Sequence, residues 1–96
     1  MYNKVTTIIN ETGLHARPAS VFAAAAKKFE ATVCVKNLGT GQEVNGKSVV
    51  RILSAGLKKG TRIEIAAEGS DAVQAVDTLT ELVDSGFDEM DANGGA

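Results

Sequence analysis

The sequence has little cysteine and histidine and lacks any long apolar run. It has a single cysteine, Cys34, so no internal disulfide can form, whereas small secreted domains usually carry several cysteines. No run of 18 apolar residues is present, and residues 1–7 lack the apolar core of a secretory signal. We therefore expect a cytoplasmic protein that neither inserts into a membrane nor holds a metal or another cofactor. The apolar run around Cys34 favours an ordinary strand residue over a reactive thiol.

An excess of positive charge is also missing. Ten Lys and Arg residues stand against twelve Asp and Glu residues, and the formal net charge of −2 argues against a nucleic-acid partner. The 96 residues fit one small domain, which we expect to be a monomer. We assign residues 1–88 to this domain and residues 89–96, which are acidic and rich in glycine, to a flexible tail.

Apolar periodicity predicts four strands and three helices in the order β-α-β-β-α-β-α. The strands are predicted over residues 2–9, 32–36, 42–44 and 62–67. Helices are predicted over residues 16–29, after Ser48 as far as Gly56, and after Ser70 and Asp71 as far as Gly86. Ser48 is expected to cap the second of these helices, and Ser70 and Asp71 to cap the third. The buried stripe of the last helix is predicted to contain Val73, Val76, Leu79 and Val83. This mixture favours an α+β fold with one sheet and the helices packed on one of its faces.

The one histidine lies where a loop enters the first predicted helix, in the run Gly13-Leu14-His15-Ala16-Arg17-Pro18-Ala19. Pro18 fits the first helical turn, because backbone amides there have no partner within the helix. The N–H groups of Ala16 and Arg17 are then expected to point outward beside His15 and form an anion site, and the guanidinium of Arg17 adds a positive fork for phosphate oxygens. Neutral imidazole is a nucleophile near pH 7, and a phosphorylated ring nitrogen is labile. The arrangement therefore suits a phosphoryl carrier.

Spacing alone leaves other interpretations of His15 open. A histidine that caps a helix without any chemistry fits the same pattern. A hydrolase with His15 as general base would need a nucleophile or a metal within reach, and no second histidine or carboxylate pair stands out. The sequence therefore favours a protein that other enzymes act on over an enzyme in its own right.

The run from Gly13 to Ala19 resembles the active-site motif of the HPr family, the histidine-containing phosphocarriers of the bacterial phosphotransferase system. The likeness extends from about Lys4 to Phe87 and includes Lys47-Ser48, Ala55-Gly56-Leu57, Lys59-Gly60-Thr61 and Ala67-Glu68-Gly69. The resemblance implies an open-faced β-sandwich, in which three helices cover a four-stranded antiparallel sheet. It also implies that enzyme I, charged by phosphoenolpyruvate, phosphorylates His15 on Nδ1, and that His15 passes the group to enzyme IIA proteins of sugar transporters.

The resemblance extends to the segment that begins at Ser48. Ser48 matches the serine that an HPr kinase/phosphorylase modifies in some bacteria, and a phosphate at a helix N-cap meets a favourable dipole; a plain N-cap serine is the alternative. Val50 and Leu53 resemble exposed apolar docking residues and Arg51 resembles a basic one, with core packing or a solvated charge as the alternatives. Residues 37–46 form a longer turn than is usual in the family.

Two further functions remain open beside the sugar-branch carrier. Residues 84–89 are more similar to the carrier of the nitrogen-related phosphotransferase branch than to most sugar-branch tails. A regulatory protein that binds partners through phosphorylated Ser48 is the second, although such proteins are expected to lack the histidine that this chain has at position 15.

Overall fold

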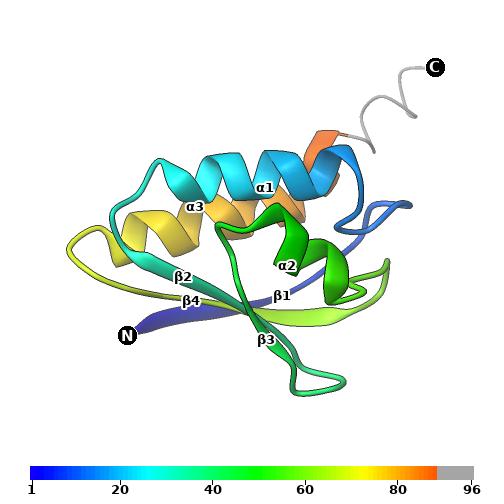
Figure 1. Cartoon of the computed structure of the whole chain (residues 1–96), viewed down its shortest axis with the longest axis horizontal. Helices are drawn as coiled ribbons and strands as arrows, with labels where there is room; N and C mark the ends of the chain where they lie inside the picture. The colour runs from blue at the N-terminus through cyan, green and yellow to red at the C-terminus, as the bar shows by residue number, and fades with distance from the viewer. Residues whose placement is uncertain (89–96) are drawn as a thin grey trace.

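The computed structural model describes residues 1–88, which form one sheet covered by helices (Figure 1). The strands are β1 (Tyr2–Thr7), β2 (Thr32–Asn37), β3 (Glu43–Asn45) and β4 (Arg62–Glu68). The helices are α1 (Arg17–Lys27), α2 (Val49–Ser54) and α3 (Ala72–Asp84), and a 3-10 turn over Gly86–Asp88 follows α3. This order confirms the predicted β-α-β-β-α-β-α arrangement.

The sheet is antiparallel throughout, with the strand order β1-β4-β2-β3. β4 therefore lies between β1 and β2, although it is the last strand in the chain. All three helices lie on one side of this sheet, and the other side is left uncovered (Figure 1). The predicted α+β open-faced sandwich is thus confirmed.

Along the two central strands, β2 and β4, buried apolar side chains alternate with more exposed ones, and the buried ones form the core. Val33 and Val35 of β2, and Ile63 and Ile65 of β4, are at most 1% exposed. From the helix layer, Phe22 of α1 is fully buried. Removing each such side chain from water contributes roughly 1.5–3 kcal/mol to folding. This packing fixes α1 on the sheet, and with it the loop that enters α1.

The first strand is shorter than predicted. Its pairing with β4 ends at Thr7 opposite Arg62, and the chain then turns away from the ladder. Ile8 is fully buried and holds the turn over residues 58–61 through hydrogen bonds to Thr61 and Gly60. An apolar residue at position 8 therefore marks a packed loop, which the β-branched pattern does not distinguish from a strand.

The buried stripe of α3 differs from the predicted one at Val73. That side chain is 52% exposed, so its assignment to the core is wrong. The buried residues of α3 are Ala72, Ala75, Val76, Leu79, Thr80 and Val83. Position 73 lies at the edge of this stripe, because each residue advances about 100° around the helix axis.

Asp71 holds a loop rather than capping α3 with its side chain. It occupies the N-cap position, yet its carboxylate makes no capping hydrogen bond to α3, contrary to the prediction. Its oxygens accept hydrogen bonds from the backbone N–H groups of Glu30 (2.9 Å) and Ala31 (2.8 Å). The bond from Glu30 is the largest cause that holds the pKa of the Asp71 carboxyl below its ordinary value of 3.8. Asp71 thereby ties the end of α1 to the start of α3.

The acidic tail predicted for residues 89–96 lies outside the described residues. Within residues 1–88, no helix has both the length and the apolar character needed to cross a membrane.

Candidate functional site

The loop that carries His15 is held by a close backbone approach at Gly13. Gly13 has a φ of +65°, and a Cβ at this position would lie 2.4 Å from the carbonyl oxygen of Leu57 and 2.9 Å from the Cα of Lys58. The N–H of Leu14 donates a hydrogen bond of 2.8 Å to the same Leu57 oxygen. Glycine alone accommodates both the positive φ and the approach. The His15 loop is therefore fixed against the segment that follows α2.

Asn10 supports the same loop from the inside, a role that the sequence did not suggest. Its side chain is fully buried, and its amide N–H donates to the carbonyl of Gly13 at 2.9 Å and to the hydroxyl of Thr12 at 3.3 Å. The N–H of Gly13 in turn donates to the Asn10 carbonyl at 3.1 Å. The only available signal was an asparagine three residues before a glycine, which is typical of a turn.

The start of α1 presents backbone donors next to His15. His15, Ala16 and Arg17 are all exposed, and Arg17 is the first residue of α1. Among the hydrogen bonds between described residues, none uses the N–H of Ala16 or of Arg17. Pro18, in the first turn, has no N–H to offer. An imidazole thus lies beside two unengaged donors at the positive end of a helix.

Ala16 adopts a backbone conformation that is unusual for a residue with a side chain. Its φ is 51° and its ψ is −123°, at the N-cap position of α1. Such conformations cost roughly 1–3 kcal/mol and are concentrated at functional sites. The close contact of Gly13 with the backbone of Leu57 and Lys58 fixes the loop before Ala16, and Pro18 begins the helix after it. The residues between Gly13 and Pro18 are therefore held in this unusual backbone conformation.

A small hollow opens beside His15. Its lining consists of Thr12, Leu14, His15, Leu53, Gly56, Leu57 and Lys58. The hollow has a volume of about 240 Å³. This is below the roughly 300–1,000 Å³ of pockets that enclose small molecules, so it suits a small group rather than a cofactor. The resemblance placed Leu53 beside the histidine, but the sequence did not indicate that residues 56–58 also meet the His15 loop.

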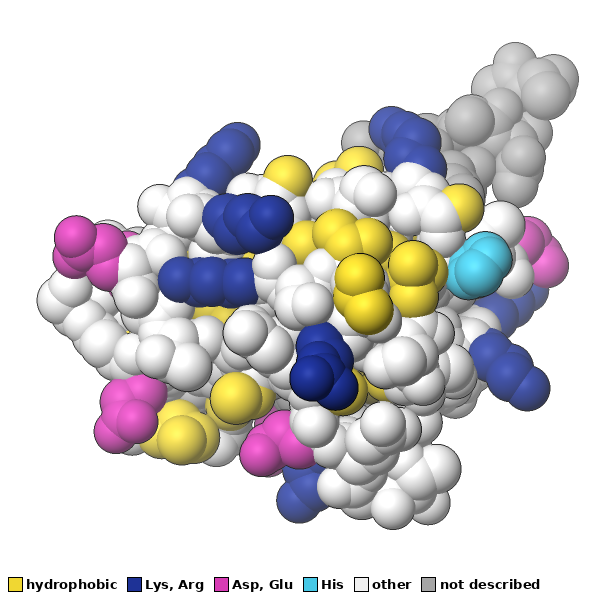
Figure 2. Space-filling view, viewed as in Figure 1, with side chains coloured by type: hydrophobic (Ala, Val, Ile, Leu, Met, Phe, Trp, Pro, Cys, Tyr) yellow, Lys and Arg dark blue, Asp and Glu magenta, His cyan; other side chains and the backbone are white. Residues whose placement is uncertain are grey.

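An apolar patch flanks the histidine. Val50 is 74% exposed and Leu53 is 39% exposed, so both lie on the surface and not in the core, and Arg51 between them in sequence is also exposed. Ile52 supplies the buried side of α2. Figure 2 shows the cyan histidine at the edge of a yellow apolar area, with Lys and Arg side chains around that area.

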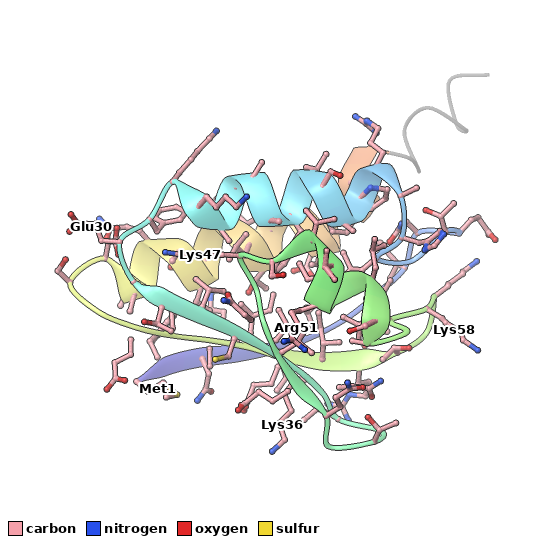
Figure 3. The ribbon with its side chains drawn as sticks, in the orientation of Figure 1. Met1, Glu30, Lys36, Lys47, Arg51 and Lys58 are labelled. Carbon is pink, nitrogen blue, oxygen red and sulfur yellow. The ribbon has the colours of Figure 1, made fainter. Side chains whose placement is uncertain are left out.

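Ser48 is the N-cap of α2. Its hydroxyl oxygen accepts a hydrogen bond of 3.2 Å from the backbone N–H of Arg51, as the N-cap prediction requires. The preceding residue, Lys47, donates from Nζ to the carbonyl of Phe29 at 2.7 Å and so joins the end of α1 to the start of α2 (Figure 3). Ser48 itself is half-buried.

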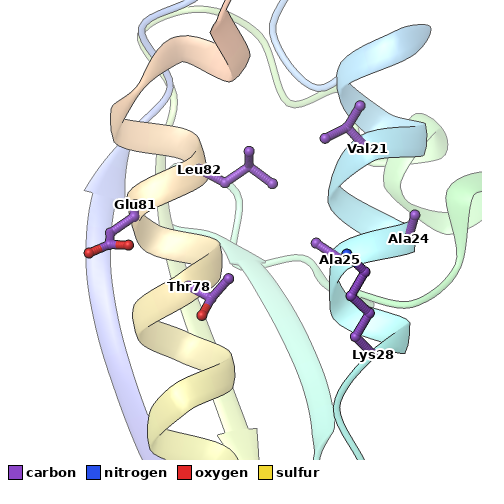
Figure 4. A pocket seen from close by; sticks show the side chains of 7 residues that line it. All are labelled: Val21, Ala24, Ala25, Lys28, Thr78, Glu81 and Leu82. Atoms are coloured by element: carbon purple, nitrogen blue, oxygen red, sulfur yellow. The ribbon is translucent and has the colours of Figure 1, made fainter.

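A larger hollow lies away from His15. It has a volume of about 550 Å³ and lies between α1 and α3, where Val21, Ala25 and Leu82 form its apolar surface and Lys28 and Glu81 contribute charge (Figure 4). Its lining contains no imidazole, no thiol and no pair of carboxylates. Size alone therefore does not locate the chemistry, and the smaller hollow is the better candidate.

Cys34 is half-buried in β2, as the strand interpretation requires. Burial, and then the nearby carboxylate of Glu43, raise the pKa of its thiol. A raised pKa lowers the fraction of thiolate, which is the nucleophilic form, so a reactive thiol is not favoured. Residues 1–88 hold no group of three or more His, Cys, Asp or Glu side chains placed to bind a metal ion.

Known sequences match most of this chain. The family described as "PTS HPr component phosphorylation site" matches residues 2–85. The phosphocarrier protein HPr of Vibrio cholerae is 42% identical over 84 residues, which cover 88% of this chain and 96% of that protein. The multiphosphoryl transfer protein of Haemophilus influenzae is 42% identical over 86 residues, which cover 88% of this chain. The chain spans 17% of the length of that relative and 22% of its Escherichia coli counterpart.

Related structures have the same fold. The crystal structure of HPr-C-His from Thermoanaerobacter tengcongensis superposes with a TM-score of 0.86 at 38% identity, covering 91% of this chain and 96% of that chain. A phosphocarrier protein HPr from Bacillus anthracis gives a TM-score of 0.81 at 35% identity, covering 85% of this chain and 95% of that chain. Residues 2–85, which the family matches, include the His15 loop, α2 and all four strands. Sequence and structure thus agree that this chain belongs to the HPr family of the phosphotransferase system.

Proposed function

We propose that the chain is a phosphocarrier that accepts a phosphoryl group from enzyme I on Nδ1 of His15 and delivers it to enzyme IIA proteins of sugar transporters. The observation that carries this proposal is the exposed imidazole of His15 beside the unengaged N–H groups of Ala16 and Arg17, in a chain of the HPr family. An anion that arrives at His15 meets these donors at the positive end of α1.

The transfer forms one bond to phosphorus and breaks another. The lone pair on Nδ1 of His15 forms the new bond to phosphorus while the bond between phosphorus and the donor group of enzyme I breaks, and the electron pair of that bond stays on the donor group. The other ring nitrogen of His15 then loses its proton, and the donor group takes one up. Charge on the phosphoryl oxygens persists throughout, so amide donors and the Arg17 guanidinium assist by position and electrostatics.

The site is suited to a carrier rather than to an enzyme that completes a reaction. A carrier has to release the group, and an open site with a few donors holds it less tightly than an enclosed one. The exposed patch of Val50 and Leu53 beside the site provides apolar area for a partner, and Arg51 provides positive charge for acidic partners.

A relay assay tests this function. The purified protein is incubated with phosphoenolpyruvate and enzyme I, and enzyme IIA is then added. We expect one phosphoryl group per chain before the addition and its loss afterwards. Parallel reactions with enzyme I of the sugar branch and of the nitrogen-related branch assign the branch, and labelling by neither would contradict the proposal.

Arg17→Ala is expected to slow phosphoryl transfer about tenfold or more, because a charge-assisted contact of roughly 1.5–3 kcal/mol is lost. The fold should be unaffected, since the Arg17 side chain is exposed. Rapid-quench measurements of transfer to and from His15 test this, with thermal melting as the control. Unchanged rates in both directions would mean that the backbone amides suffice.

We propose in addition that phosphorylation of Ser48 regulates docking, through an HPr kinase/phosphorylase in organisms that have one. Ser48 already accepts a hydrogen bond at the start of α2, so a negative charge there is compatible with the helix. The same charge would lie next to Val50 and Arg51, and it would therefore repel an acidic partner surface.

Ser48→Asp is expected to weaken the affinity for enzyme I about threefold to tenfold at low salt, with a smaller effect at high salt. Aspartate is also a good N-cap, so thermal stability should be kept or slightly increased. Ser70→Asp is the control for the added charge, because it places the same charge on an exposed serine before α3 rather than at the N-cap of α2. Titration of enzyme I with both variants measures the effect, and equal affinities at low salt would leave Ser48 as a plain N-cap.

A further inference from the structure

We propose that Lys58 is a further ligand of the phosphoryl group on His15, and that its ammonium holds one of the phosphoryl oxygens. The proposal rests on the carrier function above and adds a residue to that site. It starts from the hollow beside the imidazole, which His15 and Lys58 line together.

The backbone of Lys58 is fixed close to the His15 loop. Its Cα lies 2.9 Å from the position that a Cβ would take at Gly13, two residues before His15. The hydrogen bond from the N–H of Leu14 to the carbonyl of Leu57 anchors the residue before Lys58. These are backbone contacts, so they place Lys58 whatever its side-chain rotamer. Figure 3 shows Lys58 between α2 and β4, at the end of the molecule opposite Glu30.

The charge of Lys58 is available, whereas that of its neighbour is not. The ammonium of Lys59 forms a salt bridge of 2.6 Å with the carboxylate of Glu11. The ammonium of Lys58 takes part in no ion pair and no side-chain hydrogen bond among residues 1–88. Of the two adjacent lysines, the one that lines the hollow therefore has an unpaired positive charge.

Lys58 complements the donors at the start of α1. The amides of Ala16 and Arg17 approach the phosphoryl group from the helix end, and Lys58 approaches it from the segment after α2. A phosphoryl group carries close to two negative charges near neutral pH. A lysine ammonium is a mobile point charge with three donors, which suits an oxygen that arrives and leaves. This role involves no proton transfer from Lys58, so its effect is to stabilise the phosphorylated form relative to the free form.

The equilibrium of phosphoryl exchange with enzyme I tests this role. Its constant depends on how well each free protein holds the group, and not on how strongly the two proteins dock. We expect Lys58→Met to shift this equilibrium away from phosphorylated His15 about threefold to tenfold. Lys58→Arg keeps the positive charge, and its equilibrium constant should stay close to that of the wild type. Lys59→Met removes the same charge from the neighbouring residue and should leave the equilibrium unchanged.

A second measurement is independent of enzyme I. The phosphorylated protein is titrated downward from alkaline pH, over the range in which phosphohistidine survives, and is followed by phosphorus NMR. Loss of the Lys58 charge should raise the pKa of the phosphoryl group, because a nearby cation favours the dianion. If Lys58→Met and Lys59→Met match the wild type in both measurements while all three are labelled at His15, the role of Lys58 is overturned and the carrier function stands. If the wild type takes up no phosphoryl group, both proposals fall.

Discussion

His15→Ala is expected to accept no phosphoryl group from enzyme I while keeping its fold. His15 is the only histidine in the chain, and its side chain lies on the surface at the start of α1. Substitution of an exposed side chain usually changes stability by less than about 0.5 kcal/mol. Removal of the imidazole removes the nucleophile, however, and neither the amides nor Arg17 can replace it.

Labelling with phosphoenolpyruvate and enzyme I measures this loss, and circular dichroism during thermal melting verifies the fold. Arg17→Ala is the matched control, since it alters the same helix start but keeps the imidazole. That control should reach one phosphoryl group per chain, only more slowly. Complete labelling of His15→Ala would rule out the carrier mechanism proposed for this site.

Gly13→Ala is expected to destabilise the protein by roughly 2–5 kcal/mol. A non-glycine residue with positive φ costs about 1–2 kcal/mol, and the new Cβ would also overlap the Leu57 carbonyl oxygen. Relief of that overlap would move the His15 loop away from Leu57 and Lys58. The melting temperature should then fall by roughly 8 °C or more, and phosphoryl transfer should slow in the fraction that remains folded.

Gly56→Ala separates the two causes of this destabilisation. Gly56 has nearly the same φ, +63°, but a Cβ there would meet nothing within 4 Å. We expect this control to lose only the conformational part, about 1–2 kcal/mol. Chemical denaturation of both variants gives the comparison. If both variants lost the same free energy of unfolding, the close approach at Gly13 would not be what holds the loop.

The sequence predicted the parts of this fold that depend on local pattern. The alternation of Ile63 and Ile65, the N-cap at Ser48 and the proline in the first turn of α1 each reflect short-range physics, and the structure has all three. The seven-residue run around His15 indicated the family for the same reason. Its chemistry is local to one loop and one helix end.

Features that depend on tertiary contacts were missed or mispredicted. The sequence assigned Asp71 to a local helix cap, whereas its carboxylate binds amides about forty residues away in the chain. It placed Val73 in the core, because apolar character does not say which edge of a stripe meets the sheet. It also gave no reason to bring Lys58 to His15. That meeting depends on the approach of two loops at Gly13, and a glycine by itself does not identify its neighbour.

Mapping of the phosphoryl group on the intact wild-type protein tests the central claim most directly. The protein is incubated with enzyme I and phosphoenolpyruvate, and the group is then located by mass spectrometry under neutral conditions that preserve phosphohistidine. The account predicts one acid-labile phosphoryl group per chain, located on His15. An unlabelled protein, or a single acid-stable group on Ser48 with His15 unmodified, would contradict it.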